Sequence, residues 1–207
     1  MALKRRMGPE NAATRSLLMD AVETVMREQG YAALSARSVA ARAGLKYQIV
    51  FYYFETMDDL LLATYRRRTQ RVLERSEQAL DSERPLHAFW QAWSDPFDAA
   101  LTLEYMAMSN HNQVIRAETI AFGERLRQIA AEKLSPRLGH ASPAPEVFTP
   151  MGVTMAITLM GGVLGFESAL GIAGGHRETE AIVDWCLRQL EPDGPDAPPG
   201  GELPRSG

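Results

Sequence analysis

The amino-acid sequence predicts an all-α protein of about nine helices, for three reasons. Apolar residues recur at intervals of three and four along most of the chain, as on the buried stripe of an amphipathic helix. Glycine and proline interrupt this spacing where helices would end, for example at Gly174-Gly175. No stretch of alternating apolar and polar residues is long enough to predict a strand.

The composition is that of an ordinary soluble globular protein, with 207 residues of which 45% are hydrophobic and 23% are charged. This length suits one large domain or two small ones. The charge is unevenly distributed, because residues 1–80 carry 13 Lys/Arg and 9 Asp/Glu, whereas residues 81–207 carry 9 and 17. A basic front and an acidic back suit nucleic acid at one end of the protein and something else at the other.

Cysteine usage and hydropathy favour a cytoplasmic location. Cys186 is the only cysteine, which excludes a disulfide framework. The basic residues 4–6 are not followed by the apolar segment of a signal peptide. The longest uncharged apolar stretch, residues 151–166, is shorter than the roughly 20 residues of a membrane-spanning helix, so no membrane partner is expected.

The first part of the chain reads as an arm followed by a helix. Residues 1–12 are expected to form a flexible basic arm, because Gly8-Pro9 would break a helix. Thr14–Gln29 is predicted to be the first helix, which Gly30 ends.

Two short helices with a glycine between them follow. Ser35 is a good N-cap for the first, and Gly44 ends it where a left-handed residue is needed. The second begins near Lys46 and exposes Lys46, Tyr47 and Gln48. Its apolar residues Leu45, Val50 and Phe54 can face inward. This is the helix-turn-helix pattern, whose second helix suits the major groove of DNA.

The next helix is predicted over residues 56–81, long enough to connect two domains. Thr56 and Asp59 resemble a capping box at its start. Its arginines (Arg66, Arg67, Arg68, Arg71 and Arg75) are interpreted as a solvated face. Ion pairs with the acidic domain and attraction to DNA are the alternatives.

The remaining helices are predicted from apolar spacing, with Pro85 at the start of the first. The predicted segments are helices over residues 85–93, 95–110, 113–134, 146–172 and 177–190, a loop over 135–145, and a disordered tail over 192–207.

The stretch from Leu34 to Leu61 resembles the DNA-binding domain of the tetracycline-repressor (TetR) family. The resemblance lies in its S-x-R-x-V-A-x-x-A-G-L core and its Y-Y-F-E-T-x-D-D-L-L tail. It implies a DNA-binding domain over residues 13–55 and a helical ligand-binding and dimerisation domain over residues 56–191. It also implies a dimeric transcriptional repressor that a small-molecule inducer releases from a palindromic operator.

The resemblance also implies roles for single residues. Base-reading positions of the family fall here on Lys46, Tyr47, Gln48 and Ile49, and phosphate-clamping positions fall on Arg37, Ser38 and Tyr53. The chain departs from the family at two positions, because Phe51 stands where a tyrosine is usual and Met57 where a lysine is usual. Neither side chain can donate a hydrogen bond to phosphate.

No signature of an enzyme, a cofactor or a metal site was found in the sequence. Glu104 and His111 are seven residues apart and could share a helix face, as an acid/base pair, as the lining of a pocket, or as ordinary surface or core. The alternative function is that of an α-helical enzyme or small-molecule-binding protein that does not bind DNA.

Aromatic and methionine side chains of the second domain are mostly typical of a core, but they also suit an adaptable apolar cavity. We expect the cavity between the connecting helix and the segments from residue 90 to 111, with a largely apolar ligand. The candidate ligand-binding residues are Trp90, Trp93, Phe97, Tyr105, Met108, His111, Phe122 and Met155.

A homodimer is expected through the last two helices, over residues 147–172 and 177–190. The first is apolar on every side, so one of its faces would need cover from a second copy. Gly161, Gly162 and Gly165 would let helices approach closely.

Overall fold

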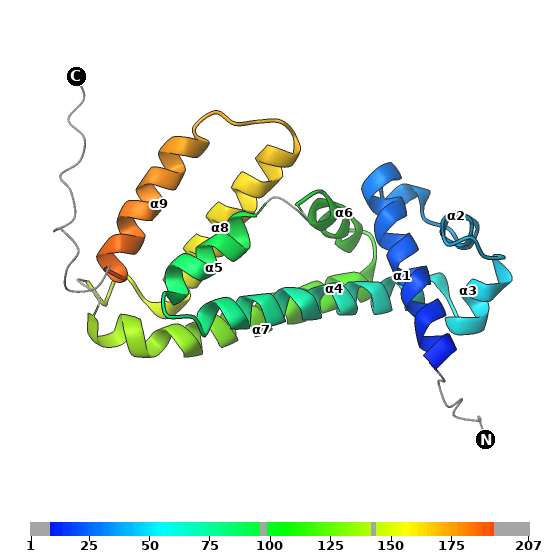
Figure 1. Cartoon of the computed structure of the whole chain (residues 1–207), viewed down its shortest axis with the longest axis horizontal. Helices are drawn as coiled ribbons and strands as arrows, with labels where there is room; N and C mark the ends of the chain where they lie inside the picture. Colours follow the sequence, from blue (N-terminus) through cyan, green and yellow to red (C-terminus); the bar gives the residue numbers. More distant parts are fainter. Residues whose placement is uncertain (1–8, 96–98, 142–143, 193–207) are drawn as a thin grey trace. The chain divides into compact units, whose positions relative to one another are not determined.

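The structure, a computed structural model, describes residues 9–95, 99–141 and 144–192 (Figure 1). Within these ranges the chain forms nine α-helices, one short 3-10 helix and no strand, which confirms the all-α prediction. The elements are α1 (Pro9–Gln29), η1 (Tyr31–Ala33), α2 (Ala36–Arg42), α3 (Gln48–Tyr53), α4 (Met57–Leu80), α5 (Pro85–Ser94), α6 (Ala99–Ser109), α7 (Gln113–Ala141), α8 (Pro150–Ala169) and α9 (His176–Leu190).

The chain divides into two compact units. Unit 1 comprises the described residues up to Val72 together with Ala100–Phe122, and unit 2 comprises Leu73–Ala99 and the described residues from Gly123 onward. This division follows packing, and it assigns α6 and the start of α7 to the same unit as α1, α2 and α3. The boundary predicted after residue 55 concerns function, and it stays a prediction.

Unit 1 has one apolar core, to which each of its helices contributes. Each helix has an apolar stripe that faces inward. The stripes of α1, α2 and α3 pack against those of the first half of α4 and of α6. The core residues include Leu18, Val22, Met26, Val39, Val50, Phe54, Leu60, Leu101, Tyr105, Met108 and Ile115.

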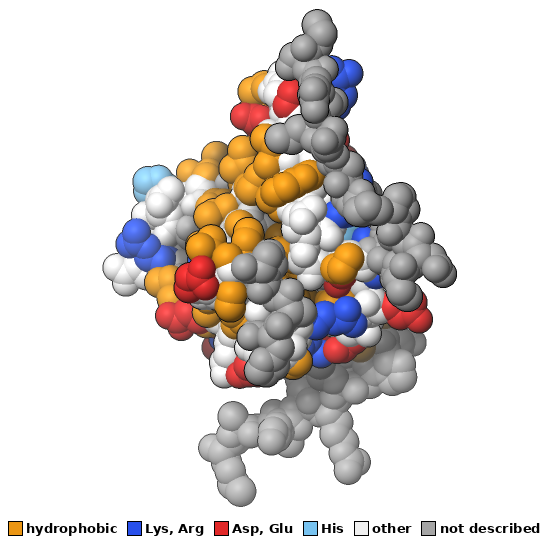
Figure 2. All heavy atoms as spheres, turned by 90° about the vertical axis from the view of Figure 1, so that its left-hand side faces the viewer, with side chains coloured by type: hydrophobic (Ala, Val, Ile, Leu, Met, Phe, Trp, Pro, Cys, Tyr) orange, Lys and Arg blue, Asp and Glu red, His pale blue; other side chains and the backbone are white. Residues whose placement is uncertain are grey.

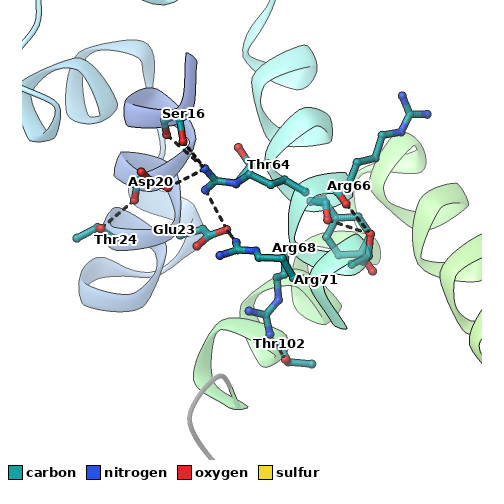
Figure 3. Close-up of polar contacts among 12 residues, drawn as sticks. Ser16, Asp20, Glu23, Thr24, Thr64, Arg66, Arg68, Arg71 and Thr102 are labelled. Carbon is teal, nitrogen blue, oxygen red and sulfur yellow. Dashed lines mark hydrogen bonds and ion pairs between the residues drawn. The ribbon is translucent and has the colours of Figure 1, made fainter. Parts of the chain in front are cut away.

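Arginines of α4 join α4 to α1 (Figure 3). Arg67 forms ion pairs with Asp20, at 2.7 Å, and with Glu23, at 3.3 Å, and Arg71 pairs with the same Glu23 at 2.6 Å. Glu23 is buried, so its charge is held where water cannot screen it fully. Asp20 and Glu23 lie three residues apart, on one face of α1.

Two more arginines join α4 to the other helices of unit 1 (Figure 3). Arg68 donates a 2.7 Å hydrogen bond to the hydroxyl of Thr102 on α6, and Arg66 pairs with Glu118 on α7. The sequence-based interpretation of this run as a solvated face is therefore wrong for Arg67 and Arg68, whose side chains are largely buried. Arg66 and Arg71 form ion pairs but remain more than half exposed. Charge counting along one helix does not reveal acidic partners that only tertiary packing brings near.

Unit 2 is built on a close crossing of α5 and α8. A Cβ atom on Gly161 would lie 2.9 Å from the carbonyl carbon and oxygen of Trp93, so only glycine permits this approach. Gly161 was expected to serve helix contacts between two copies, and the structure instead uses it within one chain.

The buried carboxylate of Glu191 caps the start of α5. Its two oxygens accept hydrogen bonds from the backbone N–H groups of Leu86, at 3.4 Å, and His87, at 3.3 Å, and the His87 ring lies 2.7 Å from one of them. Because the first N–H groups of a helix lack partners within it, an acidic group at this position is stabilising. The C-terminal end of α9 is thereby attached to the start of α5.

Helix α7 extends through a segment that the sequence analysis predicted to be a loop. Its last residue is Ala141, and Pro136 lies inside it. Pro136 has no N–H to donate to the preceding turn, which normally interrupts a helix. Leu134 and Leu138, four residues apart on one face, are both fully buried, and their packing offsets that loss.

Two other helix boundaries differ from the prediction. Helix α1 begins at Pro9, so residues 9–12 are helical and do not belong to an arm; proline is tolerated at a first helical position because its missing N–H would have no partner there. Lys4, Arg5 and Arg6 lie outside the described residues. Helix α8 begins at Pro150, where the Thr149 hydroxyl accepts the N–H of Gly152 at 3.1 Å.

Helices α8 and α9 leave a broad apolar surface open to solvent. Figure 2 shows many hydrophobic side chains gathered on one face of unit 2, which contains α8 and α9. By length and composition alone α8 could cross a membrane, but core helices of soluble proteins pass the same test, and α8 packs on α5. The exposed apolar side chains are those of Val147, Met151, Leu159, Val163, Leu170, Ile172, Ile182 and Trp185.

Candidate nucleic-acid interface

The first helix of the predicted helix-turn-helix begins at a complete capping box. The Ser35 hydroxyl accepts the N–H of Ser38 at 3.1 Å, and the Ser38 hydroxyl accepts the N–H of Ser35 at 2.9 Å. Ser38 also donates to the carbonyl oxygen of Ala33, at 2.8 Å. The N-cap prediction for Ser35 is confirmed, and the hydroxyl of Ser38, a predicted phosphate clamp, is already engaged inside the protein.

The turn between α2 and α3 has the left-handed glycine that the sequence indicates. Gly44 has a φ of +68°, and the N–H of Leu45 donates to the carbonyl oxygen of Ala40 at 2.8 Å. The second helix starts later than predicted, at Gln48, so that Lys46 and Tyr47 precede it.

The structure brings the predicted base-reading residues to one exposed place. Lys46, Tyr47 and Gln48 are all exposed at the start of α3, and Ile49 is half-buried behind them. The Val50 side chain is fully buried and packs α3 against the core of unit 1. Three polar or amphipathic side chains are thus presented to solvent at the start of α3.

Arg37 of α2 and Tyr47, the residue that precedes α3, lie close together. The Arg37 guanidinium carbon is 5.9 Å from the centre of the Tyr47 ring, within the range of a cation–π contact. Arg37 is exposed, so its charge stays available to a phosphate. Both residues are predicted to contact DNA, and their contact with each other depends on how α2 packs beside the start of α3.

Tyr53 has polar partners within the protein. Its hydroxyl donates to Oδ1 of Asn11 at 3.0 Å, and its carbonyl oxygen accepts from Arg15 at 2.6 Å. Arg15 also lies 4.1 Å above the Phe54 ring. These contacts bind α1 to the end of α3. A phosphate group would have to replace Asn11 to receive the proton of the Tyr53 hydroxyl.

The exposed residues of α2 and α3 lie in a segment that matches a known protein family. Residues 18–64 match the family model described as bacterial regulatory proteins, tetR family. Residues 18–64 therefore form a DNA-binding domain of the TetR family. TetR-family regulators bind DNA through the helix-turn-helix, so α2 and α3 form the DNA-binding motif of this protein.

Solved structures support the same fold over nearly the whole chain. A putative transcriptional regulator from Pseudomonas aeruginosa PAO1 is 22% identical. The match covers 88% of this chain and 93% of that one, with a TM-score of 0.68. A TetR transcription regulator from Haloarcula marismortui is 18% identical, with coverage of 87% and 97% and a TM-score of 0.65. A fatty acid degradation regulator, FadR, from Bacillus halodurans is 17% identical, with coverage of 90% and 96% and a TM-score of 0.61. A search of curated protein sequences found no match.

The candidate ligand-binding residues of this chain are divided between its two units. Tyr105 and Met108 are buried in the core of unit 1, Phe122 is half-buried there, and His111 is exposed in the turn after α6. Trp90 and Trp93 of α5 and Met155 of α8 are half-buried in unit 2. Phe97 lies outside the described residues.

Two open hollows lie elsewhere. One, of about 490 Å³, is in unit 1 and is lined by Arg15, Tyr53 and the start of α4. The other, of about 380 Å³, is in unit 2 and lies between α8 and the start of α9. None of the candidate ligand-binding residues lines either hollow. Among the described residues, no group of three or more His, Cys, Asp or Glu side chains could hold a metal ion.

Proposed function

We propose that this protein is a dimeric transcriptional repressor that binds a palindromic operator and is released from it by a small, largely apolar ligand. The observation that carries the proposal is the exposed group of Lys46, Tyr47 and Gln48 at the start of α3. It occurs within a domain of a DNA-binding family, where the second helix of the motif enters the major groove.

Each side chain of the interface has a role suited to its chemistry. The Gln48 amide can form two hydrogen bonds with adenine, and Ile49 can cover a thymine methyl group. Lys46 and Tyr47 extend this base-reading group at its N-terminal side. Arg37, oriented by its contact with Tyr47, clamps a phosphate, which positions the protein without carrying sequence information.

Phosphate contacts are lost at Phe51 and Met57, and basic residues elsewhere are available to replace them. Phe51 and Met57 cannot donate to phosphate, and the Ser38 and Tyr53 hydroxyls already donate within the protein. We propose that the basic residues 4–6, which precede α1, supply phosphate contacts in their place.

The exposed apolar surface of α8 and α9 supports a two-fold dimer. Leu159 of α8 is 57% exposed and Ile182 of α9 is 61% exposed, and exposed apolar surfaces of this extent are typical of protein interfaces. A two-fold axis lets one such surface cover its own copy and places two recognition helices on one side of the DNA.

Release by a ligand requires only that the ligand bind the two states of the regulator with different affinities. The half-buried Trp90, Trp93 and Met155 have few charged neighbours in the sequence, which supports an apolar ligand. Because a structural neighbour of the same fold is a fatty acid degradation regulator, acyl compounds belong in a ligand screen.

The test is operator binding by the purified full chain. Selection from random DNA should enrich a palindrome with half-sites about 34–36 Å apart. Gln48→Ala should cost roughly 1–3 kcal/mol at one operator position. Arg37→Ala should weaken binding to all sequences alike and lower the salt dependence by about one charge. Equal losses on operator and random DNA for Gln48→Ala would contradict its assignment.

Dimerisation is tested separately. Ile182→Glu places a charge in the proposed interface and should give a folded monomer in sedimentation, with a large loss of operator affinity. Arg188→Glu, on the same helix but in an ion pair with Asp184, is the matched control and should remain a dimer. A wild-type monomer that binds the operator at full affinity would overturn the dimer.

A further inference from the structure

The recognition helix carries apolar surface that the proposed contacts leave unused. Phe51 is 48% exposed and Tyr52 is 50% exposed, whereas Val50 and Phe54 of the same short segment are buried. The core of unit 1 is therefore complete without the Phe51 ring. A half-exposed phenyl group on a six-residue helix suggests a partner outside the chain.

Phe51 belongs to the face of α3 that reads bases. It follows Gln48 by three residues and Tyr47 by four, and residues at these spacings are neighbours on a helix surface. The distance from Gln48 to Phe51 along the helix is about 4.5 Å, close to the spacing of one or two base pairs. The phenyl ring is thus continuous with the interface of the DNA-binding motif.

The chemistry of the major groove restricts what a phenyl ring can cover there. Base edges present hydrogen-bond donors and acceptors, and the one apolar group among them is the C5-methyl of thymine. A ring that covers a donor or an acceptor removes it from water and returns no hydrogen bond, which is unfavourable. A ring that covers a methyl group buries apolar surface on both sides.

We propose that Phe51 is a specificity-determining residue that reads the methyl group of one thymine in each half-site, one or two base pairs from the base read by Gln48. This proposal rests on the proposed operator binding. A tyrosine at this position would contact a phosphate through its hydroxyl group. Phe51 lacks that hydroxyl, and its ring contacts a base instead. Packing of the ring against a deoxyribose is the competing arrangement, and it would not depend on the methyl group.

The experiment uses the full-length protein and the operator enriched from a random DNA library. Each thymine of the half-site is replaced in turn by deoxyuridine, at symmetric positions, which removes the methyl group and leaves base pairing unchanged. Dissociation constants are measured for the wild type, Phe51→Ala, Phe51→Tyr and Gln48→Ala. Circular dichroism establishes that each variant is folded. The Phe51 variants are expected to fold because the Phe51 side chain is half exposed.

One deoxyuridine position should weaken wild-type binding roughly fourfold for each half-site, or about 15-fold for the symmetric operator, since burial of a methyl group changes an equilibrium constant by about that factor. The effect of that position should vanish in Phe51→Ala. It should persist in Phe51→Tyr, which keeps the ring, and in Gln48→Ala, which reads another base.

Two results would overturn the proposal while leaving operator binding intact. In the first, no deoxyuridine substitution weakens the wild type. In the second, Phe51→Ala weakens the thymine and deoxyuridine operators by the same factor, as contact with a deoxyribose would produce. If the library yields no enriched sequence, operator binding itself fails, and the assignment of Phe51 falls with it.

Discussion

The backbone N–H of Tyr31 donates a 2.7 Å hydrogen bond to a carboxylate oxygen of Glu104, 73 residues later in the chain. The bond joins η1, which leads into the helix-turn-helix, to α6. Gly30, with a φ of +80°, brings the backbone close to this carboxylate, since a Cβ atom there would lie 3.5 Å from the same oxygen. Of the roles left open for Glu104, the structure gives it that of a packing contact within unit 1.

Removal of the Glu104 carboxylate should destabilise unit 1. Glu104→Ala leaves the Tyr31 N–H without its acceptor and should lower the free energy of unfolding by about 1–3 kcal/mol, the cost of a donor left without a partner. Glu104→Gln keeps an oxygen acceptor and should lose less. Denaturant unfolding of both variants measures the difference, and identical losses would show that the carboxylate charge, not the hydrogen bond, matters.

The crossing of α5 and α8 makes two neighbouring glycines behave in opposite ways. Gly161→Ala forces a methyl group against the backbone of Trp93 and should cost about 1–3 kcal/mol. Gly162→Ala meets no atom within 4 Å and should stabilise the helix by up to about 1 kcal/mol, because alanine favours helices over glycine. Thermal unfolding at one fixed protein concentration compares them, since dimerisation would make stability depend on concentration. A stable Gly161→Ala protein would show that the crossing can relax.

Tyr105 is buried beside Tyr65, and its hydroxyl has no hydrogen-bond partner among the described residues. Tyr105→Phe should therefore keep stability at pH 7 or raise it by up to about 1 kcal/mol. A loss above that size would reveal a partner for the hydroxyl.

Because Tyr105 is buried, we expect the free energy of unfolding to depend on pH in the alkaline range. Burial, with a smaller contribution from Glu23, raises the pKa of Tyr105 above its ordinary value of 10.0. The unfolded chain then loses the proton first, so the free energy of unfolding should be maximal below pH 10 and fall as the pH rises above it. Tyr105→Phe should fall less steeply over the same interval, and equal slopes in chemical unfolding from pH 9 to 11 would contradict the assignment.

Arg67 and Arg71, which both pair with Glu23, should contribute differently to the free energy of unfolding. The Arg67 side chain is 23% exposed and also pairs with Asp20, whereas that of Arg71 is 56% exposed. Arg67→Ala should cost about 1–3 kcal/mol, and Arg71→Ala less than about 1 kcal/mol, because exposed ion pairs are screened by water and salt. Urea unfolding at low and high salt tests this order, and the reverse order would mean that Arg71 supplies the main contact to α1.

The sequence by itself determined the features that depend on neighbouring residues. Ser35 and Thr56 begin helices because their hydroxyls accept N–H groups three residues on, and Asp59 completes the second capping box. Gly44 and Gly175 end or begin helices because they adopt left-handed backbone conformations that other residues adopt at a cost. Such interactions are local, so they can be read from spacing, as could the group of Lys46, Tyr47 and Gln48.

Tertiary structure decided the features that depend on distant partners. Helix α7 continues through Pro136 because Leu138 is buried, and α1 starts at Pro9, where Asn11 meets Tyr53. The arginines of α4 find acidic residues on α1, and Gly161 serves α5 within the chain. Each outcome is set by the free energy of packing between elements far apart in sequence, which can exceed a local preference of a few kcal/mol and which no local pattern contains.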